Sequence, residues 1–367
     1  MPKKLVKGCY AVAEAAILGG CRFFAGYPIT PQSEIPEYLS EHLPEAGGVF
    51  IQGESEIASV NMVYGAAASG VRAMTSSSGP GMSLKAEGIS YLAGAMLPAV
   101  IVSCSRGGAG LGCIQPAQQD YFQATKALGH GGFRVMVLAP HTVQEAVDLT
   151  YDSFELAERD RNPVLVLLDG SLGSVMEEVE FPQAKPVPPR PDWAVGNFNG
   201  GTHPQRIVAS MGSKELVEQR SIRNGKLLES WEENDVRVEE YMTEDAEYII
   251  VAYGMSARVC KYAINALRKE GVKIGLIRPI TLLPFPKKAI SELDYNRVKA
   301  IIDVEMSLPV QMYDDISLQV MGRAPILTYG HAGGVVLMNE ETLEKIREMI
   351  GGLSKCCLLY TSPSPRD

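Results

Sequence analysis

The sequence has few of the features that mark membrane-bound or metal-binding proteins. None of its apolar runs approaches the roughly 18 residues that a membrane-spanning helix needs, and the first residues, "MPKKLVKG", lack the apolar core of a signal peptide. The seven cysteines form no CxxC pair and the five histidines form no HExxH motif. We therefore predict no metal or iron–sulfur site in this chain, and we expect a reduced, cytoplasmic protein.

The chain also has fewer positively charged than negatively charged residues. The 34 lysine and arginine residues are outnumbered by 43 aspartate and glutamate residues, which gives a net charge of −9. An acidic chain is a poor partner for nucleic acid or for an anionic membrane surface, so neither is expected to bind it.

The common phosphate-binding and nucleophile motifs are missing as well. The stretch "GGAGLGC" at 107–113 lacks the Lys-Ser/Thr of a P-loop, and Cys113 stands where GxGxxG needs its third glycine. No GxSxG sequence is present, so a serine nucleophile on a strand-to-helix turn has no support.

What the sequence does contain is a regular alternation of short apolar runs and helical patterns. Because the apolar runs are continuous, strands covered on both faces are predicted, and with them a doubly wound parallel sheet of the α/β class. The chain divides into a first domain at 1–180, a proline-rich linker with a charged helical segment at 181–246, and a smaller α/β domain at 247–350. Within these, helices are predicted at 117–128 and across 213–242.

Ligands of parallel α/β sheets bind beyond the carboxyl ends of the strands, so the strand-to-helix turns are the candidate site. In "GYPITPQSE", at 26–34, two prolines fix φ on either side of Ile29-Thr30 and hold the Thr30 hydroxyl in place. In "QGESE", at 52–56, Glu54 and Glu56 are two residues apart at a helix start, so their side chains point in nearly opposite directions. One of them can face a ligand, although both can simply interact with the helix dipole.

The remaining two turns lie at 76–83 and 103–116. Arg106 follows an apolar strand and precedes two glycines that let a ligand approach the backbone closely. Such an arginine suits a small carboxylate, or it is an ordinary surface side chain. The sequence "SGPG" at 78–81 is equally consistent with a tight turn and a helix N-cap.

In combination, and in this order, "GYPITP", "GESEIA", "TSSSGPGMSL", "SRGGAGLG" and "QQDYFQATK" resemble the alpha subunit of 2-oxoacid:ferredoxin oxidoreductases. The sequences "AYGMSARV" and "LIRPITLLPFP" are similar to the second domain of that subunit, so the resemblance covers about 5–350. "RGGAGLGCIQPAQQDYFQATK" and "EEYMTEDAEYIIVAYG" look most like the branched-chain, 3-methyl-2-oxobutanoate type. One departure is Ala109, where the family usually has proline.

The resemblance implies a thiamine diphosphate enzyme, with a pyrimidine-binding domain at 1–180 and a domain at 247–350 that is similar to the transketolase C-terminal domain. Glu56 matches the catalytic glutamate that hydrogen-bonds the pyrimidine N1′. Thr30 matches the threonine near cofactor and substrate, with a catalytic and a substrate-binding role, and Arg106 would pair with the substrate carboxylate. The matching turns add candidate cofactor-binding residues, namely Tyr27, Pro28, Ser78 and Gly79.

The resemblance also implies partner chains. The family's diphosphate site contains a "GDG" and a downstream asparagine that hold Mg²⁺, and neither a GDG nor a set of cluster cysteines occurs here. We therefore expect a beta subunit with the diphosphate site and an iron–sulfur cluster, a gamma subunit and a ferredoxin-like delta subunit. The implied reaction is oxidative decarboxylation of a branched-chain 2-oxoacid with coenzyme A, which reduces ferredoxin. A 2-oxoglutarate type and a non-catalytic assembly subunit are the alternatives.

The last residues, "CLLYTSPSPRD" at 357–367, break with the helical sequence before them, whose helix is expected to end at Gly351. A sequencing-library adapter that resembles a transposon mosaic end can encode these residues one by one. They are therefore expected to be an artefact without fixed structure, with a disordered natural tail as the alternative.

Overall fold

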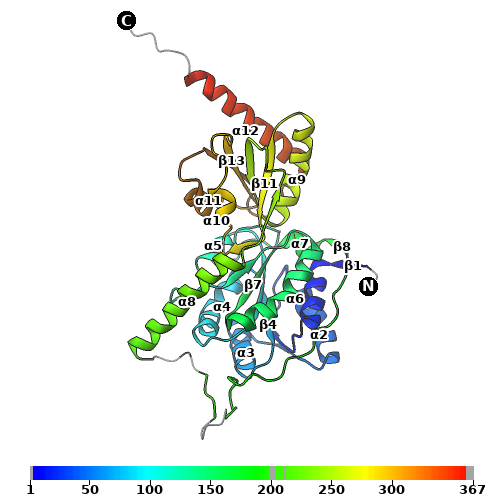
Figure 1. The fold of residues 1–367 in the computed structure, drawn as a ribbon. Coiled ribbons are helices and arrows are strands. Elements are labelled where there is room, and N and C mark those ends of the chain that lie inside the picture. Colours follow the sequence, from blue (N-terminus) through cyan, green and yellow to red (C-terminus); the bar gives the residue numbers. More distant parts are fainter. Residues whose placement is uncertain (1–2, 199–203, 208, 210–211, 361–367) are drawn as a thin grey trace.

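The computed structural model describes residues 3–198, 204–207, 209 and 212–360, which form two α/β domains, one above the other in Figure 1. The predicted linker region at 181–246 lies partly outside the described residues. Of the tail expected to be an artefact, 361–367 lies outside them as well.

The larger domain is built on a seven-stranded sheet with the order β12-β6-β7-β5-β4-β2-β3. All neighbours from β6 to β3 are parallel, whereas the edge strand β12 runs antiparallel to β6. This order confirms the doubly wound parallel sheet. The strands are β2 (Phe23–Gly26), β3 (Val49–Gln52), β4 (Ala73–Ser77), β5 (Val100–Ser105), β6 (Met136–Leu138), β7 (Val164–Asp169) and β12 (Thr281–Leu283).

Helices cover both faces of this sheet because successive strand residues point into two different cores. Phe24 and Val102 lie in the core formed with α1, α2 and α6, whereas Ala25 and Ile101 lie in the core formed with α3 and α4. A separate antiparallel ribbon pairs β1 with β8. The elements are β1 (Lys4–Lys7), α1 (Gly8–Leu18), α2 (Glu34–Glu45), α3 (Glu56–Ala68), α4 (Gly79–Gly94), α5 (Tyr121–Thr125), α6 (Val143–Asp160), α7 (Gly170–Ser174) and β8 (Met176–Val179).

The smaller domain has a five-stranded sheet with the order β14-β13-β10-β11-β9, in which β9 is antiparallel and the other pairs are parallel. Helices α9 and α12 pack on one face of the sheet, and α11 contributes to the core on the other. The elements from the linker onward are α8 (Lys214–Asn234), β9 (Val238–Tyr241), β10 (Tyr248–Val251), α9 (Gly254–Lys269), β11 (Ile274–Pro279), α10 (Lys287–Ser291), β13 (Ala300–Glu305), α11 (Tyr313–Val320), β14 (Ile326–Gly330) and α12 (Asn339–Tyr360).

Three predicted helix bounds are wrong. The helix expected at 117–128 shrinks to α5, because the chain at Gln118 hydrogen-bonds to the smaller domain instead. The segment expected to be helical across 213–242 ends its helix at Asn234, and its last part forms β9, which pairs with β11. The final helix does not end at Gly351 but continues as α12 to Tyr360, since a glycine costs a helix about 1 kcal/mol without stopping it. The first four residues of the tail at 357–367, which was expected to lack fixed structure, therefore belong to this helix.

The two domains are also more closely joined than the sequence indicates. Strand β12 follows β11 of the smaller domain, yet it pairs with β6 of the larger sheet, with Thr281 opposite Leu138.

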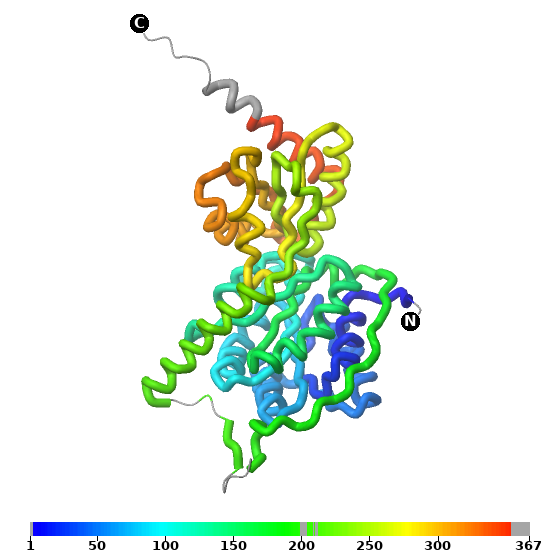
Figure 2. The backbone as a smooth tube through the Cα atoms, in the orientation of Figure 1, coloured from blue at the N-terminus to red at the C-terminus, as the bar shows by residue number. Residues whose placement is uncertain are grey.

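The proline-rich segment at 182–191, which precedes the smaller domain in the chain, has no regular structure and runs along the outside of the larger domain (Figure 2). The Lys185 N–H donates to the Leu18 carbonyl oxygen at 2.7 Å, so this segment is held against the domain.

Gln118 joins the two domains from a buried position. Its Nε2 donates to the Tyr253 carbonyl oxygen at 2.9 Å. Its Oε1 accepts hydrogen bonds from the Ser256 hydroxyl at 2.6 Å and from the Met306 N–H at 2.9 Å. All three partners belong to the smaller domain, so both the nitrogen and the oxygen of the Gln118 side-chain amide link the larger domain to the smaller one.

Replacing Gln118 by leucine should lower the thermal stability of the protein. The leucine leaves the buried Met306 N–H without its acceptor and removes the acceptor of the buried Ser256 hydroxyl, which costs roughly 1–3 kcal/mol. Thermal unfolding should show a midpoint lowered by about 2–4 °C for each kcal/mol. Gln219→Leu, at an exposed position on α8, is the matched control and should leave the midpoint in place. Equal midpoints for the two variants would contradict the role of Gln118.

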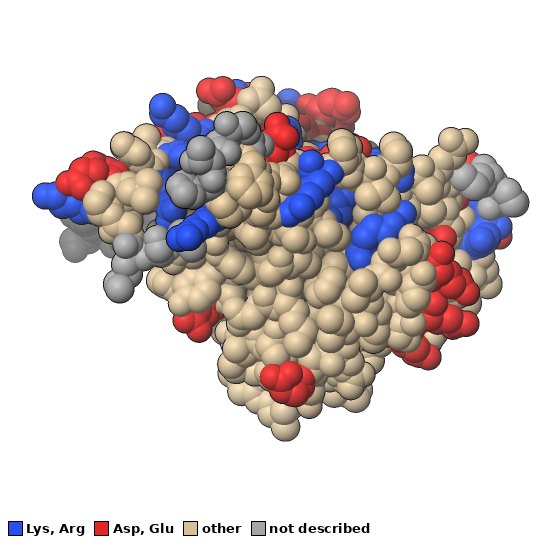
Figure 3. All heavy atoms as spheres, turned by 90° about the horizontal axis from the view of Figure 1, so that it is seen from below, with Lys and Arg blue, Asp and Glu red and all other residues tan. Residues whose placement is uncertain are grey.

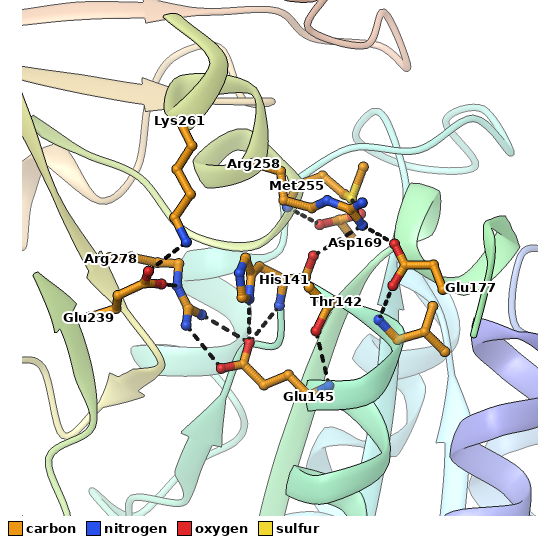
Figure 4. Close-up of polar contacts among 11 residues, drawn as sticks. His141, Thr142, Glu145, Asp169, Glu177, Glu239, Met255, Arg258, Lys261 and Arg278 are labelled. Carbon is orange, nitrogen blue, oxygen red and sulfur yellow. Dashed lines mark hydrogen bonds and ion pairs between the residues drawn. The ribbon is translucent and has the colours of Figure 1, made fainter. Parts of the chain in front are cut away.

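A charged network forms a second part of the joint (Figure 4). The buried Arg278 on β11 donates to both carboxylate oxygens of Glu145 on α6, at 2.9 and 3.0 Å, and to Glu239 on β9 at 2.6 Å. Burial acts to raise the pKa of Glu145, but hydrogen bonds from His141 and Arg278 hold it at about 2. The carboxylate therefore stays charged, and the joint keeps its ion pairs.

Candidate functional site

Three of the turns singled out in the sequence meet at one buried arginine. Arg106 follows β5 and is 5% exposed, and its Nη1 donates to the Thr30 carbonyl oxygen at 2.9 Å. Its Nη2 donates to the Leu111 carbonyl oxygen, also at 2.9 Å. A Cβ on Gly79 would lie 3.4 Å from the Arg106 Nε, so the turn after β4 passes directly beside the guanidinium. The carboxyl ends of β2, β4 and β5 therefore come together here.

The fourth turn contributes Glu56 at the start of α3. Glu56 is 6% exposed, whereas Glu54 is exposed to solvent. A Cβ on Gly81 would lie 2.6 Å from the Glu56 Oε1, so the carboxylate rests against the first turn of α4 at a point where a side chain would collide. The Ser55 side chain already caps α3 by accepting a hydrogen bond from the Ala58 N–H, and Glu56 is not needed for that purpose.

Several buried polar atoms in these turns have no hydrogen-bond partner within the described part of the chain. Protein interiors rarely leave such atoms unpaired, and each exception needs an explanation such as a ligand, a water or an ion. Their position at the carboxyl ends of β4 and β5 is where a ligand of this fold class binds. The atoms are the hydroxyls of Ser77, Ser78 and Ser103 and the Nε of Arg106.

The buried polar atoms of Ser77, Ser78, Ser103 and Arg106 form the floor of the site. The other predicted residues, at 27–30, form an exposed rim above it. Tyr27, Pro28 and Thr30 all expose their side chains. Gln32, which was not predicted, connects the rim to the floor, because its Nε2 donates to the Tyr27 carbonyl oxygen at 3.2 Å and its Oε1 accepts the Ser76 hydroxyl at 2.5 Å. The structure thus brings all the candidate residues to one edge of the sheet, with direct contacts among Thr30, Gly79 and Arg106.

Two charged residues beside the site were also not predicted from the sequence. Lys85 on α4 is fully buried, and its Nζ donates to the Thr75 hydroxyl at 2.5 Å. Asp120 follows the glycine-rich turn, and burial raises the pKa of its carboxyl group, although Ser105 and Arg106 act to lower it. For Lys85 the sequence held a signal, since this lysine interrupts the apolar pattern of a helix face.

Comparison with known proteins identifies the family. Residues 14–242 match the model for the thiamine diphosphate-binding domain of pyruvate flavodoxin/ferredoxin oxidoreductases, and residues 246–342 match core domain II of pyruvate:ferredoxin oxidoreductase. The chain is 48% identical over 353 residues to ketoisovalerate oxidoreductase subunit VorB of Methanothermobacter marburgensis, across 96% of this chain and 99% of the relative. This chain belongs to the 2-oxoacid:ferredoxin oxidoreductase family.

Other members of the family show the same relation at lower identity. The 2-oxoglutarate synthase subunit KorA of the same organism is 35% identical over 370 residues, across 94% of this chain and 98% of the relative. The 2-oxoglutarate:ferredoxin oxidoreductase of Magnetococcus marinus superposes with a TM-score of 0.82 at 27% identity, across 95% of this chain and 65% of that one. The resemblance seen in the motifs is confirmed, and the protein is an oxidoreductase subunit that works within a complex.

The site fits one half of thiamine diphosphate. The buried carboxylate of Glu56 and the unpaired hydroxyls of Ser77 and Ser78 suit the polar edge of an aminopyrimidine ring. Among the described residues, no group of three His, Cys, Asp or Glu side chains is placed to hold a metal ion. Within the same residues, no helix is long and apolar enough to cross a membrane.

Proposed function

We propose that this chain is the alpha subunit of a branched-chain 2-oxoacid:ferredoxin oxidoreductase. The complex would convert a 2-oxoacid and coenzyme A into acyl-CoA and carbon dioxide and pass the electrons to ferredoxin. The observation that carries the proposal is the buried Glu56 carboxylate, which lies against Gly81 where four turns converge. The higher identity to the ketoisovalerate relative, 48% against 35% for KorA, favours the branched-chain type.

Glu56 would hold the aminopyrimidine ring and share a proton with its N1′ atom. When bound, the cofactor supplies the carbon nucleophile that attacks the 2-oxo group. Glu56 keeps the shared proton in a position screened from water, where hydrogen bonds to a charged group are strong. Ser78 and Gly79 would line the ring beside it, and the rim at 27–30 would orient the reacting end of the substrate.

Arg106 would bind the substrate carboxylate. Its Nε has no hydrogen-bond partner among the residues that the structure describes, and its Nη2 bonds the Leu111 carbonyl in a glycine-rich turn where the Leu111 side chain is 82% exposed. A carboxylate can take the unpaired Nε and displace the Leu111 carbonyl, since an ionised acceptor makes the stronger hydrogen bond. The Thr30 carbonyl would keep Nη1 in place and thereby hold the guanidinium toward the rim.

The charges in the four turns favour a substrate with a single carboxylate. Arg106 is the one cation in 26–34, 52–56, 76–83 and 103–116. A 2-oxoglutarate substrate carries a second carboxylate, which would need a second cation to offset its desolvation. A branched aliphatic side chain has no such requirement, so this count also favours the branched-chain type.

A weakly charged face next to the site suggests where a partner subunit packs. Of the charged residues on α3 and α4, Glu56 and Lys85 are buried, and Glu87 is exposed. Ile57 and Leu84 expose 49% and 48% of their surface on these helices. Seen from below, the larger domain shows a broad area with few charged side chains (Figure 3). We propose that a beta subunit covers α3 and α4 and supplies the Mg²⁺–diphosphate site and an iron–sulfur cluster, with gamma and delta subunits completing the path to ferredoxin.

The single chain should bind thiamine diphosphate much more weakly than the assembled complex. The sequence contains no GDG of the kind that holds Mg²⁺ and the diphosphate in this family, so the chain would contribute the ring site alone. Calorimetry with thiamine diphosphate and Mg²⁺ on the single chain and on the complex checks this expectation. Equally tight binding by the two would show that the chain holds the whole cofactor by itself.

The proposed reaction is tested with the purified complex and a panel of 2-oxoacids. Reduction of ferredoxin should depend on coenzyme A and should have its highest kcat/KM with a branched-chain 2-oxoacid. A preference for 2-oxoglutarate would place the enzyme in the alternative type. A complex that is equally active without this chain would show that the chain serves only in assembly.

A further inference from the structure

The proposed chemistry leaves one buried charge unexplained. Lys85 lies in the second turn of α4 and is 0% exposed. Its Nζ donates to the Thr75 hydroxyl at 2.5 Å, and that hydroxyl donates to the Ala25 carbonyl oxygen at 2.7 Å. Among the described residues no carboxylate forms an ion pair with this amine. A lysine is seldom fully buried unless it is paired, so this position calls for a functional explanation.

The packing of α3 on α4 places Lys85 next to Glu56. Cβ atoms on Gly81 and Gly88 would lie 2.6 Å from the Glu56 Oε1 and 2.4 Å from the Val60 Cγ1, so both glycines of α4 contact α3. Glu56 and Val60 are four residues apart and share one face of α3. Lys85 is four residues after Gly81 and three before Gly88, so it lies on the same seam between the two helices.

The electrostatics agree with this placement. Burial lowers the pKa of Lys85 to about 7, while the negative charge of Glu56 acts to raise it. The amine therefore changes its charge near neutral pH. The strands beneath it present only uncharged groups to its Nζ, the Thr75 hydroxyl and behind it the Ala25 carbonyl, and the nearest other acid on α4, Glu87, faces solvent.

We propose that Lys85 is a positioning residue that acts through Glu56 and sets the pH range in which the site binds its cofactor. The inference rests on the proposed role of Glu56. A charged amine beside Glu56 attracts the negative charge of the carboxylate, and a neutral amine leaves that charge to act on the ring alone. When the amine loses its proton near neutral pH, the positive charge beside Glu56 is lost, so the contact between the carboxylate and the ring should depend on pH in that range.

The test uses Lys85→Met in the assembled complex, because methionine keeps the shape of the side chain and removes the amine. The Kd for thiamine diphosphate with Mg²⁺ is measured by calorimetry from about pH 6 to about pH 9, together with kcat/KM. Lys85→Met lacks the amine that changes its charge near pH 7, so the midpoint of each profile should shift away from that of the wild type. Glu87→Gln, on the same helix but exposed, is the matched control and should follow the wild type.

A Glu56→Gln background shows whether Lys85 acts through Glu56. There Lys85→Met should cause no further shift, and a shift that persists would overturn the inference. Identical profiles for wild type and Lys85→Met would overturn it while leaving the proposed function in place, whereas a wild-type complex that binds no thiamine diphosphate would overturn the proposed function itself. If Lys85→Met does not assemble, Lys85→Gln, which keeps a donor for Thr75, should show the same shift and decides the question in its place.

Discussion

Replacing Glu56 by glutamine should lower the kcat/KM of the assembled complex by at least about 100-fold for every 2-oxoacid that it accepts. Glutamine has nearly the same size, and its amide cannot share a proton with a ring nitrogen as a carboxylate does. The residue is buried against Gly81, so no neighbouring water can take over the role easily. Steady-state ferredoxin reduction measures the loss, and calorimetry with thiamine diphosphate shows how much of it is lost binding.

The chain itself offers the matched control for this experiment. Glu54 lies two residues earlier, carries the same charge and is exposed to solvent. Glu54→Gln should therefore keep wild-type activity, and a comparable loss in both variants would point to the charge of the turn rather than to one carboxylate. Wild-type turnover in Glu56→Gln would exclude Glu56 from the proton step.

Replacing Arg106 by leucine should raise the KM for every 2-oxoacid in the panel, whatever its side chain. The loss of a charge-assisted hydrogen bond to the common carboxylate is worth roughly 1.5–3 kcal/mol, or about 10- to 150-fold in KM. Arg106→Lys should fall between wild type and leucine, because lysine keeps the charge but lacks the planar fork that contacts several acceptors at once.

The contacts of Arg106 add a structural requirement to this test. The guanidinium also bonds the Thr30 and Leu111 carbonyls, so the variant removes a link between two turns. Thermal unfolding of the complex has to be compared, and KM has to be measured well below the midpoint of the less stable protein. A stable Arg106→Leu complex with an unchanged KM would show that the carboxylate binds elsewhere.

Much of the fold and of the site could be predicted from local sequence. Continuous apolar runs between helical patterns predict a parallel sheet with helices on both faces, and the sheet order confirms it. The two-residue spacing of Glu54 and Glu56 in a helix predicts that the two carboxylates face different ways. In the structure α3 begins only at Glu56 and Ser55 caps it, so Glu54 lies before the helix and its exposure does not come from the helical turn. The structure buries one of them and exposes the other.

Other features depend on contacts between distant segments, and these were decided by the tertiary structure alone. Strand β12 leaves the smaller domain to pair with β6, and β9 forms at the end of a charged helical segment because β11 offers a free edge. Gln118 lies outside the helix that was expected around it, because its side-chain amide hydrogen-bonds to three groups in the smaller domain. Local propensities differ by less than about 1 kcal/mol per residue, so a few long-range hydrogen bonds outweigh them.

The division within the site follows the same physical rule. The sequence by itself determined which residues stand at the carboxyl ends of the strands, since strand-to-helix turns can be located from periodicity. Only the tertiary structure decided that Arg106 is closed in by the Thr30 and Leu111 carbonyls, and that Lys85 lies buried on the seam beside Glu56. Burial and pairing depend on what the rest of the chain packs against each side chain, and that packing joins residues far apart in sequence.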